Sequence, residues 1–173
     1  MMKKTIIKTI IIILIPLILF VIGLLFYYPS FKVIAFSYED SEQLLAYLPL
    51  KEEKTFQLKY THSIHLSDVI ETYEATSKNI KLTTLEYEDF AVGMPSNAEG
   101  DEIFKVTNGK YQITNMKRIF PYIDLRIGQV RANHQFIYLN KTYTLSDYIK
   151  PGTWVRISLK RISLWQQLKG VNL

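Results

Sequence analysis

The chain has 173 residues, of which 48% are hydrophobic and none is cysteine, and its formal net charge at pH 7 is +5. The lack of cysteine excludes disulfide bonds and a lipoprotein anchor, so a folded domain must be stabilised by its own apolar core. Three of the 21 Lys and Arg lie before residue 9, and the remaining 18 against 16 Asp and Glu leave a balance of only +2. This small excess does not favour nucleic-acid binding, and we expect none. The length fits one ordinary domain and a membrane segment.

The amino-terminal residues differ in composition from the rest of the chain. Lys3, Lys4 and Lys8 precede residues 9–28, a run of 20 residues without a charged side chain. Twenty helical residues rise about 30 Å, which matches the hydrocarbon core of a bilayer. Lysines before the run favour a cytoplasmic amino terminus, and no small-residue cleavage site follows it. We therefore predict a basic cytoplasmic stub at residues 1–8 and a single-pass transmembrane signal anchor at residues 9–28. The anchor contacts membrane lipid, and the bulk of the chain lies outside the cell membrane.

Residues 31–160 contain many short runs rich in β-branched and aromatic side chains, which are typical of strands. We expect strands at residues 33–38, 56–64, 69–75, 80–87, 104–106, 111–113, 123–127, 136–139 and 142–145, and a last one that contains Val155, Ile157 and Leu159. Residues 42–48 fit either a short strand or a helix. The pattern predicts an all-β extracytoplasmic domain, an antiparallel β-sandwich or barrel-like domain of many short strands, preceded by one N-terminal transmembrane helix.

Local signals predict three backbone features within this domain. Asn108-Gly109 is the strongest short hairpin signal in the chain, because a tight turn there needs positive φ at both positions. Asn140-Lys141 predicts a second tight turn. Thr83-Thr84 interrupts the alternation of its strand and predicts a β-bulge.

The C-terminal tail, residues 161–173, has a different pattern from the strands. Ile162, Trp165 and Leu168 recur at helical spacing among basic side chains. This spacing predicts a short amphipathic helix, which lies either on the membrane surface or against the β-domain.

The most regular β pattern in the chain lies at residues 56–76, where apolar and polar side chains alternate on both sides of a polar break at residues 65–68. We expect a hairpin with these opposed pairs: Leu58–Ala75, Tyr60–Tyr73, His62–Glu71 and Ile64–Val69. Directly opposed Cβ atoms lie about 4.5–5.5 Å apart, so this register lets the imidazole of His62 contact the carboxylate of Glu71. Both side chains then belong to the apolar face, where an ionisable pair requires an explanation.

A set of short motifs, from Tyr60 to His134, follows in a definite order within a region of likeness that covers about residues 33–159. In chain order they are Tyr60-Thr61-His62-Ser63-Ile64, Glu71 with Tyr73, Gly93-Met94-Pro95, Gly100, Ile123-Asp124-Leu125-Arg126-Ile127-Gly128 and Asn133-His134. Their order and spacing resemble the bacterial family catalogued as domain of unknown function 1850. His65 departs from the family pattern and receives no family role. The resemblance implies a small secreted or membrane-anchored protein, often encoded beside tripartite ATP-independent periplasmic (TRAP) transporters of the TAXI class, and therefore an accessory role in solute uptake.

Two kinds of catalytic or metal site are disfavoured by strand geometry. Successive side chains of a strand point to opposite faces, so His62 cannot activate Ser63 as a hydrolase nucleophile. By the same argument His62 and His65 lie on opposite faces, and the chain has no closely spaced pair of metal ligands to join Glu71 and His134. We predict no catalytic residue, no metal site and no cofactor.

The His62–Glu71 pair leaves two interpretations open. It is either a hydrogen-bonded polar pair that fixes the strand register, or part of a site at one end of the domain, beside the Gly93 loop, that contacts a small ligand. The residues that the second interpretation assigns to binding are Tyr60, His62, Ser63, Glu71, Tyr73, Gly93 and Pro95.

The function that we predict is that of a non-enzymatic accessory, for binding or scaffolding, of a TRAP-type solute transporter. Its expected protein partner is the transporter's permease or its solute-binding subunit. The alternative is a surface-exposed enzyme or small-ligand binder that uses His62 and Glu71 as acid and base.

Overall fold

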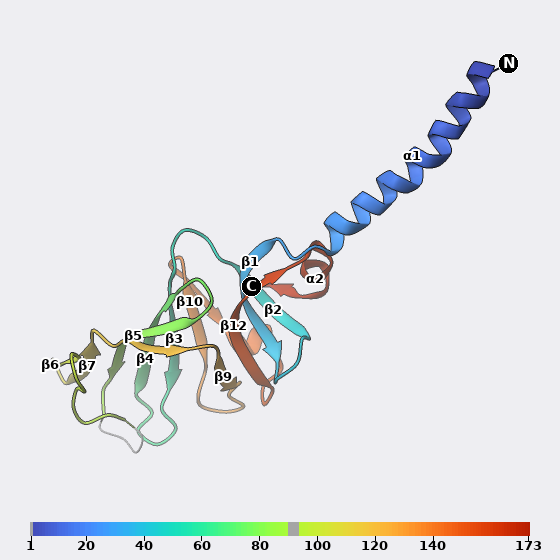
Figure 1. Ribbon diagram of the computed structural model, residues 1–173. Coiled ribbons are helices and arrows are strands. Elements are labelled where there is room, and N and C mark those ends of the chain that lie inside the picture. Colours follow the sequence, from blue (N-terminus) through green and yellow to red (C-terminus); the bar gives the residue numbers. More distant parts are fainter. Residues whose placement is uncertain (1, 90–93) are drawn as a thin grey trace.

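Figure 1 shows the fold in a computed structural model, which describes residues 2–89 and 94–173, with only the backbone for residues 2–10. A long helix extends away from a domain built of two β-sheets. In chain order the elements are α1 (Met2–Tyr27), β1 (Phe31–Tyr38), β2 (Leu44–Pro49), β3 (Thr55–Thr61), β4 (Asp68–Ala75), β5 (Ile80–Tyr87), β6 (Ile103–Thr107), β7 (Lys110–Thr114), β8 (Arg118–Phe120), β9 (Ile123–Arg126), β10 (Gln135–Tyr138), β11 (Lys141–Thr144), the 3-10 helix η1 (Leu145–Asp147), β12 (Trp154–Ile162), α2 (Leu164–Lys169) and β13 (Val171–Asn172).

The two sheets are mostly antiparallel, which confirms the predicted class of β-domain. The first sheet has the strand order β13-β2-β1-β12-β9, in which only the short β13 pairs in parallel. The second has the order β11-β10-β3-β4-β5-β7-β6, with β8 also paired to β5. Residues 42–48, for which the sequence allowed a helix, contribute to strand β2. Among the described residues, no helix combines the length and the apolar character that a membrane crossing requires.

Strand β1 is buried on both faces, which explains its continuous apolar sequence. Ile34 and Phe36 belong to the main core, whereas Val33 and Ala35 belong to a smaller apolar cluster. The smaller cluster also contains Tyr47, Ile162 and Leu44. The turn after α2 covers it so closely that a Cβ atom on Gly170 would lie 2.8 Å from the Leu44 side chain. The C-terminal tail therefore packs on the outer face of the first sheet.

The main core contains a row of aromatic rings that connects the sheets. Phe36 of β1 contacts Phe136 of β10 edge to face, with ring centroids 5.2 Å apart. Phe56 of β3 stacks on Phe136 at 4.9 Å and on Tyr73 of β4 at 5.5 Å. Phe56 and Phe136 are fully buried, so these contacts form the centre of the domain.

The hairpin of β3 and β4 has a different register from the predicted one. Leu58 lies opposite Glu71 and Tyr60 opposite Val69, so the pairing of His62 with Glu71 was wrong. The physical reason is a longer turn, over residues 62–67. The backbone N–H of His62 donates to the carbonyl of Ser67 at 2.8 Å, which closes this turn before the strand can continue.

The other local predictions agree with the structure except at one turn. Asn108 and Gly109 both have positive φ, as the predicted hairpin turn requires. Thr83 is the extra residue at a register shift between β4 and β5, which confirms the bulge. The turn predicted at Asn140-Lys141 instead uses Leu139 and Asn140, both left-handed, because Tyr138 pairs with Lys141.

Candidate functional site

Glu71 is the acidic member of an apolar row that crosses the second sheet. The register places it between Leu58 of β3 and Leu85 of β5 on the core side of β4. The row continues on both sides through Phe136, Ile113 and Phe104. A carboxyl group in such a position needs hydrogen-bond donors, because burying it without them costs roughly several kcal/mol of stability.

Two tyrosines supply these donors. The Tyr73 hydroxyl donates to Oε2 of Glu71 at 2.7 Å, and the Tyr60 hydroxyl lies 3.4 Å from Oε1. Tyr73 is two residues from Glu71 along β4 and therefore shares its face, while Tyr60 is its diagonal neighbour on β3. We call Tyr60, Glu71 and Tyr73 the phenol–carboxylate cluster.

The cluster perturbs the acidity of all three of its members. Burial raises the pKa of the Glu71 carboxyl, and the hydrogen bonds from Tyr73 and Tyr60 oppose this rise in part. Burial and the neighbouring Glu71 charge raise the pKa of both tyrosine hydroxyls. Both hydroxyls therefore keep their protons near neutral pH and act as donors to the carboxylate.

His134 extends the cluster toward the loop between β9 and β10. Its ring lies 5.7 Å from the ring of Tyr60, centroid to centroid. Its Nδ1 accepts the backbone N–H of Gly128 at 3.1 Å, which places the proton of the neutral ring on Nε2. Burial lowers the pKa of His134, so the ring is neutral near pH 7.

The structure brings some of the predicted site residues together and separates others. Tyr60, Glu71 and Tyr73 form the cluster. His62 and Ser63 instead lie in the turn after β3, where the side chain of Ser63 is exposed. The carbonyl of Pro95 accepts a hydrogen bond from the hydroxyl of Tyr87. Gly93 lies outside the described residues.

The prediction that His62 and His65 point to opposite faces of one strand was also wrong. Both belong to the turn over residues 62–67, where their ring centroids lie 5.8 Å apart. Even so, the part of the chain that the structure describes contains no group of three or more His, Asp or Glu side chains placed to hold a metal ion.

The contact between Tyr60 and His134 was not predicted from the sequence. Both residues belong to the motifs that carry the family resemblance, but the sequence pattern relates His134 only to a set of candidate metal ligands. The position of His134 in the fold explains this contact, since His134 lies just before β10 and β10 pairs with β3. A side chain just before β10 therefore lies near the end of β3.

The geometry of the phenol–carboxylate cluster supports a structural role better than a catalytic one. Each phenol has a single proton, and both are directed at Glu71. The cluster thus keeps no phenolic donor free to stabilise a developing negative charge. The hydrogen bond from Tyr60 joins β3 to β4 at one register, and the bond from Tyr73 within β4 holds Glu71 in place for it, which is a recognised use of a polar group on a core face.

Replacing Glu71 by glutamine should change how stability depends on pH. Because the pKa of Glu71 is raised above its ordinary value of 4.5, the folded chain keeps a proton that the unfolded chain has already released. The stabilisation from this proton is complete below pH 4.5 and is lost as the pH rises through the raised pKa. The difference in unfolding free energy, wild type minus Glu71→Gln, should therefore fall as the pH rises from 4.5 through the raised pKa of Glu71. Above that pKa the difference should stay constant. Urea unfolding at a series of pH values measures this difference.

A matched control for this experiment is Glu74→Gln on the same strand. The Glu74 side chain is 45% exposed and forms an ion pair with Lys81. Glu74→Gln should therefore lose stability with rising pH in the same way as the wild type, because its Glu71 is unchanged. A constant difference between the wild type and Glu71→Gln at every pH would contradict the assignment of a raised pKa to Glu71.

The fold and the cluster define a class of protein, a two-sheet β-domain with a glutamate held between two tyrosines on the core face of one sheet. The family model described as "Domain of unknown function (DUF1850)" matches residues 56–145, just over half of the chain. The protein therefore belongs to this family. The matched region contains the phenol–carboxylate cluster, Gly128 and His134. A comparison with curated proteins and with solved structures found no match.

Proposed function

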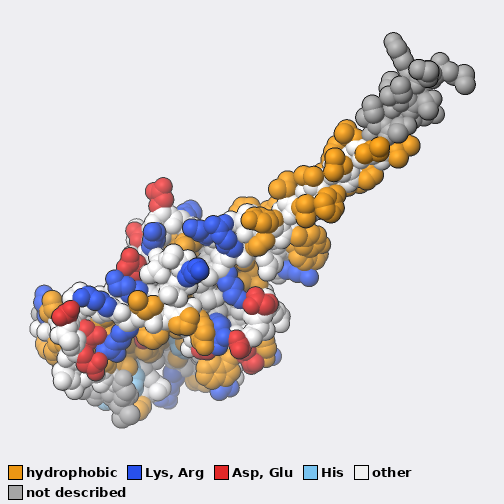
Figure 2. All heavy atoms as spheres, viewed as in Figure 1, with side chains coloured by type: hydrophobic (Ala, Val, Ile, Leu, Met, Phe, Trp, Pro, Cys, Tyr) orange, Lys and Arg blue, Asp and Glu red, His pale blue; other side chains and the backbone are white. Residues whose placement is uncertain are grey.

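We propose that the protein is a membrane-anchored, extracytoplasmic β-domain that serves a TRAP-type solute transporter as a non-enzymatic binding or scaffolding accessory. The observation that carries the anchoring is the apolar surface of α1. Every large apolar side chain in residues 11–25 is exposed (Figure 2), and the helix extends clear of the sheets (Figure 1). A helix that is apolar all round requires a surrounding that is apolar too, and a bilayer provides it.

The junction between α1 and the domain supports an anchor that is held at the domain surface. Only residues 28–30 separate α1 from β1. The rings of Phe26 and Tyr27 lie 6.0 and 5.9 Å from the ring of Trp165 in α2. The side chain of Arg161 donates to the carbonyl of Ser30 at 3.1 Å. Such a short, contacted linker keeps the domain close to the membrane that would contain α1.

A non-enzymatic role is supported by the state of the phenol–carboxylate cluster. Its donors are already used within the cluster, and the alternative acid–base pair of His62 and Glu71 has no geometric basis in the observed register. The choice of the transporter as partner rests on the family resemblance, because members of the family are often encoded beside TRAP transporters of the TAXI class.

Photo-crosslinking in native membranes tests the transporter as partner. A photoreactive residue replaces, one at a time, Val106, Ile119 and Val130, whose side chains are 58%, 61% and 90% exposed on the β-domain. We expect the permease or the solute-binding subunit among the products, and reduced uptake of the transported solute when the protein is deleted. The control joins residues 1–29 to an unrelated exported domain and should give neither product. Normal uptake without a crosslinked subunit, in cells that express both, would contradict the accessory role.

A further inference from the structure

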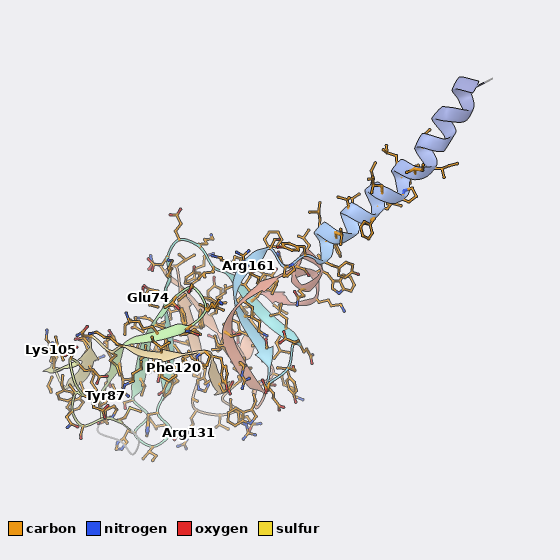
Figure 3. All side chains as sticks on the ribbon, in the orientation of Figure 1. Glu74, Tyr87, Lys105, Phe120, Arg131 and Arg161 are labelled. Atoms are coloured by element: carbon orange, nitrogen blue, oxygen red, sulfur yellow. The ribbon has the colours of Figure 1, made fainter. Side chains whose placement is uncertain are left out.

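A groove of about 600 Å³ opens between the two sheets at the end of the domain next to α1. Lys32 and Arg161 line it from the first sheet, where Arg161 also contacts the linker after α1. Lys54 lines it from the segment before β3, and Lys78 from the turn between β4 and β5. Figure 3 places Arg161 beside the base of α1, and Figure 2 shows Lys and Arg side chains gathered there.

The lining of this groove is strongly cationic. Five of its ten residues are basic and none is acidic: Lys32, Lys54, Lys78, Lys160 and Arg161. Lys160 pairs with Glu42 at 3.1 Å, and the ion pairs found among the described residues include none of the other four. Glu53, in the loop before β3, is engaged elsewhere, because its side chain accepts the backbone N–H of Thr55.

The strand register concentrates this charge instead of dispersing it. Lys32 and Arg161 are directly opposed on β1 and β12. Like charges in opposed positions destabilise a sheet, so a bound anion would stabilise this arrangement. The floor of the groove is apolar, since Leu50 and Leu159 line it between the basic side chains. A cationic rim around an apolar floor fits a ligand that has both an anionic and an apolar part.

From this position and chemistry we infer that the groove binds the phosphate head group of an anionic phospholipid. The inference rests on the proposed anchoring, because the three-residue linker after α1 places the groove at the surface of the membrane in which α1 would lie. Basic side chains at that height reach the phosphate of a lipid head group and bind it as charge-assisted donors. The occupant is thus a lipid of the anchoring membrane, and not a free phosphate ester.

Lipid retention by the full chain in neutral detergent measures this binding by native mass spectrometry. We expect the chain to retain one phosphatidylglycerol molecule and to retain phosphatidylcholine at least about tenfold less. Soluble glycerol phosphate at equal concentration should not compete with phosphatidylglycerol. Lys78→Gln with Arg161→Gln should weaken phosphatidylglycerol retention about tenfold or more. The matched control, Lys105→Gln with Arg131→Gln, removes the same two charges away from the groove (Figure 3) and should change retention less than about twofold.

A second groove variant, Lys32→Gln with Lys54→Gln, leaves the contact of Arg161 with Ser30 intact and should lose phosphatidylglycerol in the same way. Thermal melts identify any variant that is unfolded. Three results would each overturn the lipid site. They are equal losses of phosphatidylglycerol in the groove and control variants, unchanged retention in both folded groove variants, and full competition by glycerol phosphate. The assay does not require a bilayer or a transporter. A chain that binds the lipid in detergent but fails to enter nanodiscs would therefore contradict the anchoring and not the groove.

Discussion

Phe56→Ala should lower the free energy of unfolding of the β-domain by about 3–5 kcal/mol. The Phe56 side chain is 1% exposed and stacks on both Phe136 and Tyr73, so its removal leaves a cavity between the sheets. The loss also frees one face of Tyr73, which holds Glu71 through its hydroxyl. Because a domain is typically stable by only about 5–15 kcal/mol, this variant should be close to unfolding at physiological temperature. Urea unfolding of the full chain in detergent measures the change.

The control for this prediction is the same substitution at an exposed phenylalanine. Phe120 of β8, labelled in Figure 3, is at the surface of the domain. Its side chain is 37% exposed, so Phe120→Ala should cost less than about 1 kcal/mol. Equal costs at the two positions would show that the aromatic row is not the centre of the core.

Ile18→Arg with Leu19→Arg should abolish the membrane association of the chain. Both residues lie near the middle of the uncharged run at residues 9–28, where each arginine disfavours insertion by about 2.5–3.5 kcal/mol. The two substitutions together therefore oppose insertion by roughly 5–7 kcal/mol. Fractionation of cells, followed by detection of the chain in the membrane pellet and the supernatant, gives the result.

Ile18→Ala with Leu19→Ala is the matched control and should remain in the membrane pellet, because it shortens the same side chains without adding charge. The arginine variant remaining in the pellet after a salt and alkaline wash would contradict an anchor formed by residues 9–28.

The sequence was sufficient to predict which face the paired side chains of β3 and β4 occupy, but not the register, and it wrongly placed His62 and Ile64 of the turn on the apolar face. The predicted and observed pairings of β3 with β4 differ by an even number of residues, so alternation assigns Tyr60, Glu71 and Tyr73 to the core face in both. The two registers differ because of the turn over residues 62–67, where Leu66 adopts a positive φ of 58°. Leucine gives no local signal for that conformation, unlike Asn108-Gly109, whose turn was predicted correctly.

The remaining features could not be predicted because they depend on contacts between distant parts of the chain. Glu71 was recognised as an ionisable group on an apolar face, but its partners follow from the register. The groove combines Lys32, Lys54, Lys78 and residues 160–161, which no spacing rule connects. Only the pairing of β1 with β12 brings Lys32 and Arg161 side by side.

Protease treatment of intact protoplasts or spheroplasts tests the central claim, an exported β-domain held by an uncleaved anchor. The chain carries a tag after Leu173, and a cytoplasmic protein serves as the control for cell integrity. We predict that the tag and the β-domain are digested while the cytoplasmic control survives, and that the chain isolated before digestion still begins at its original amino terminus. A β-domain that survives until the cells are lysed, or an isolated chain that begins near residue 30, would contradict the account.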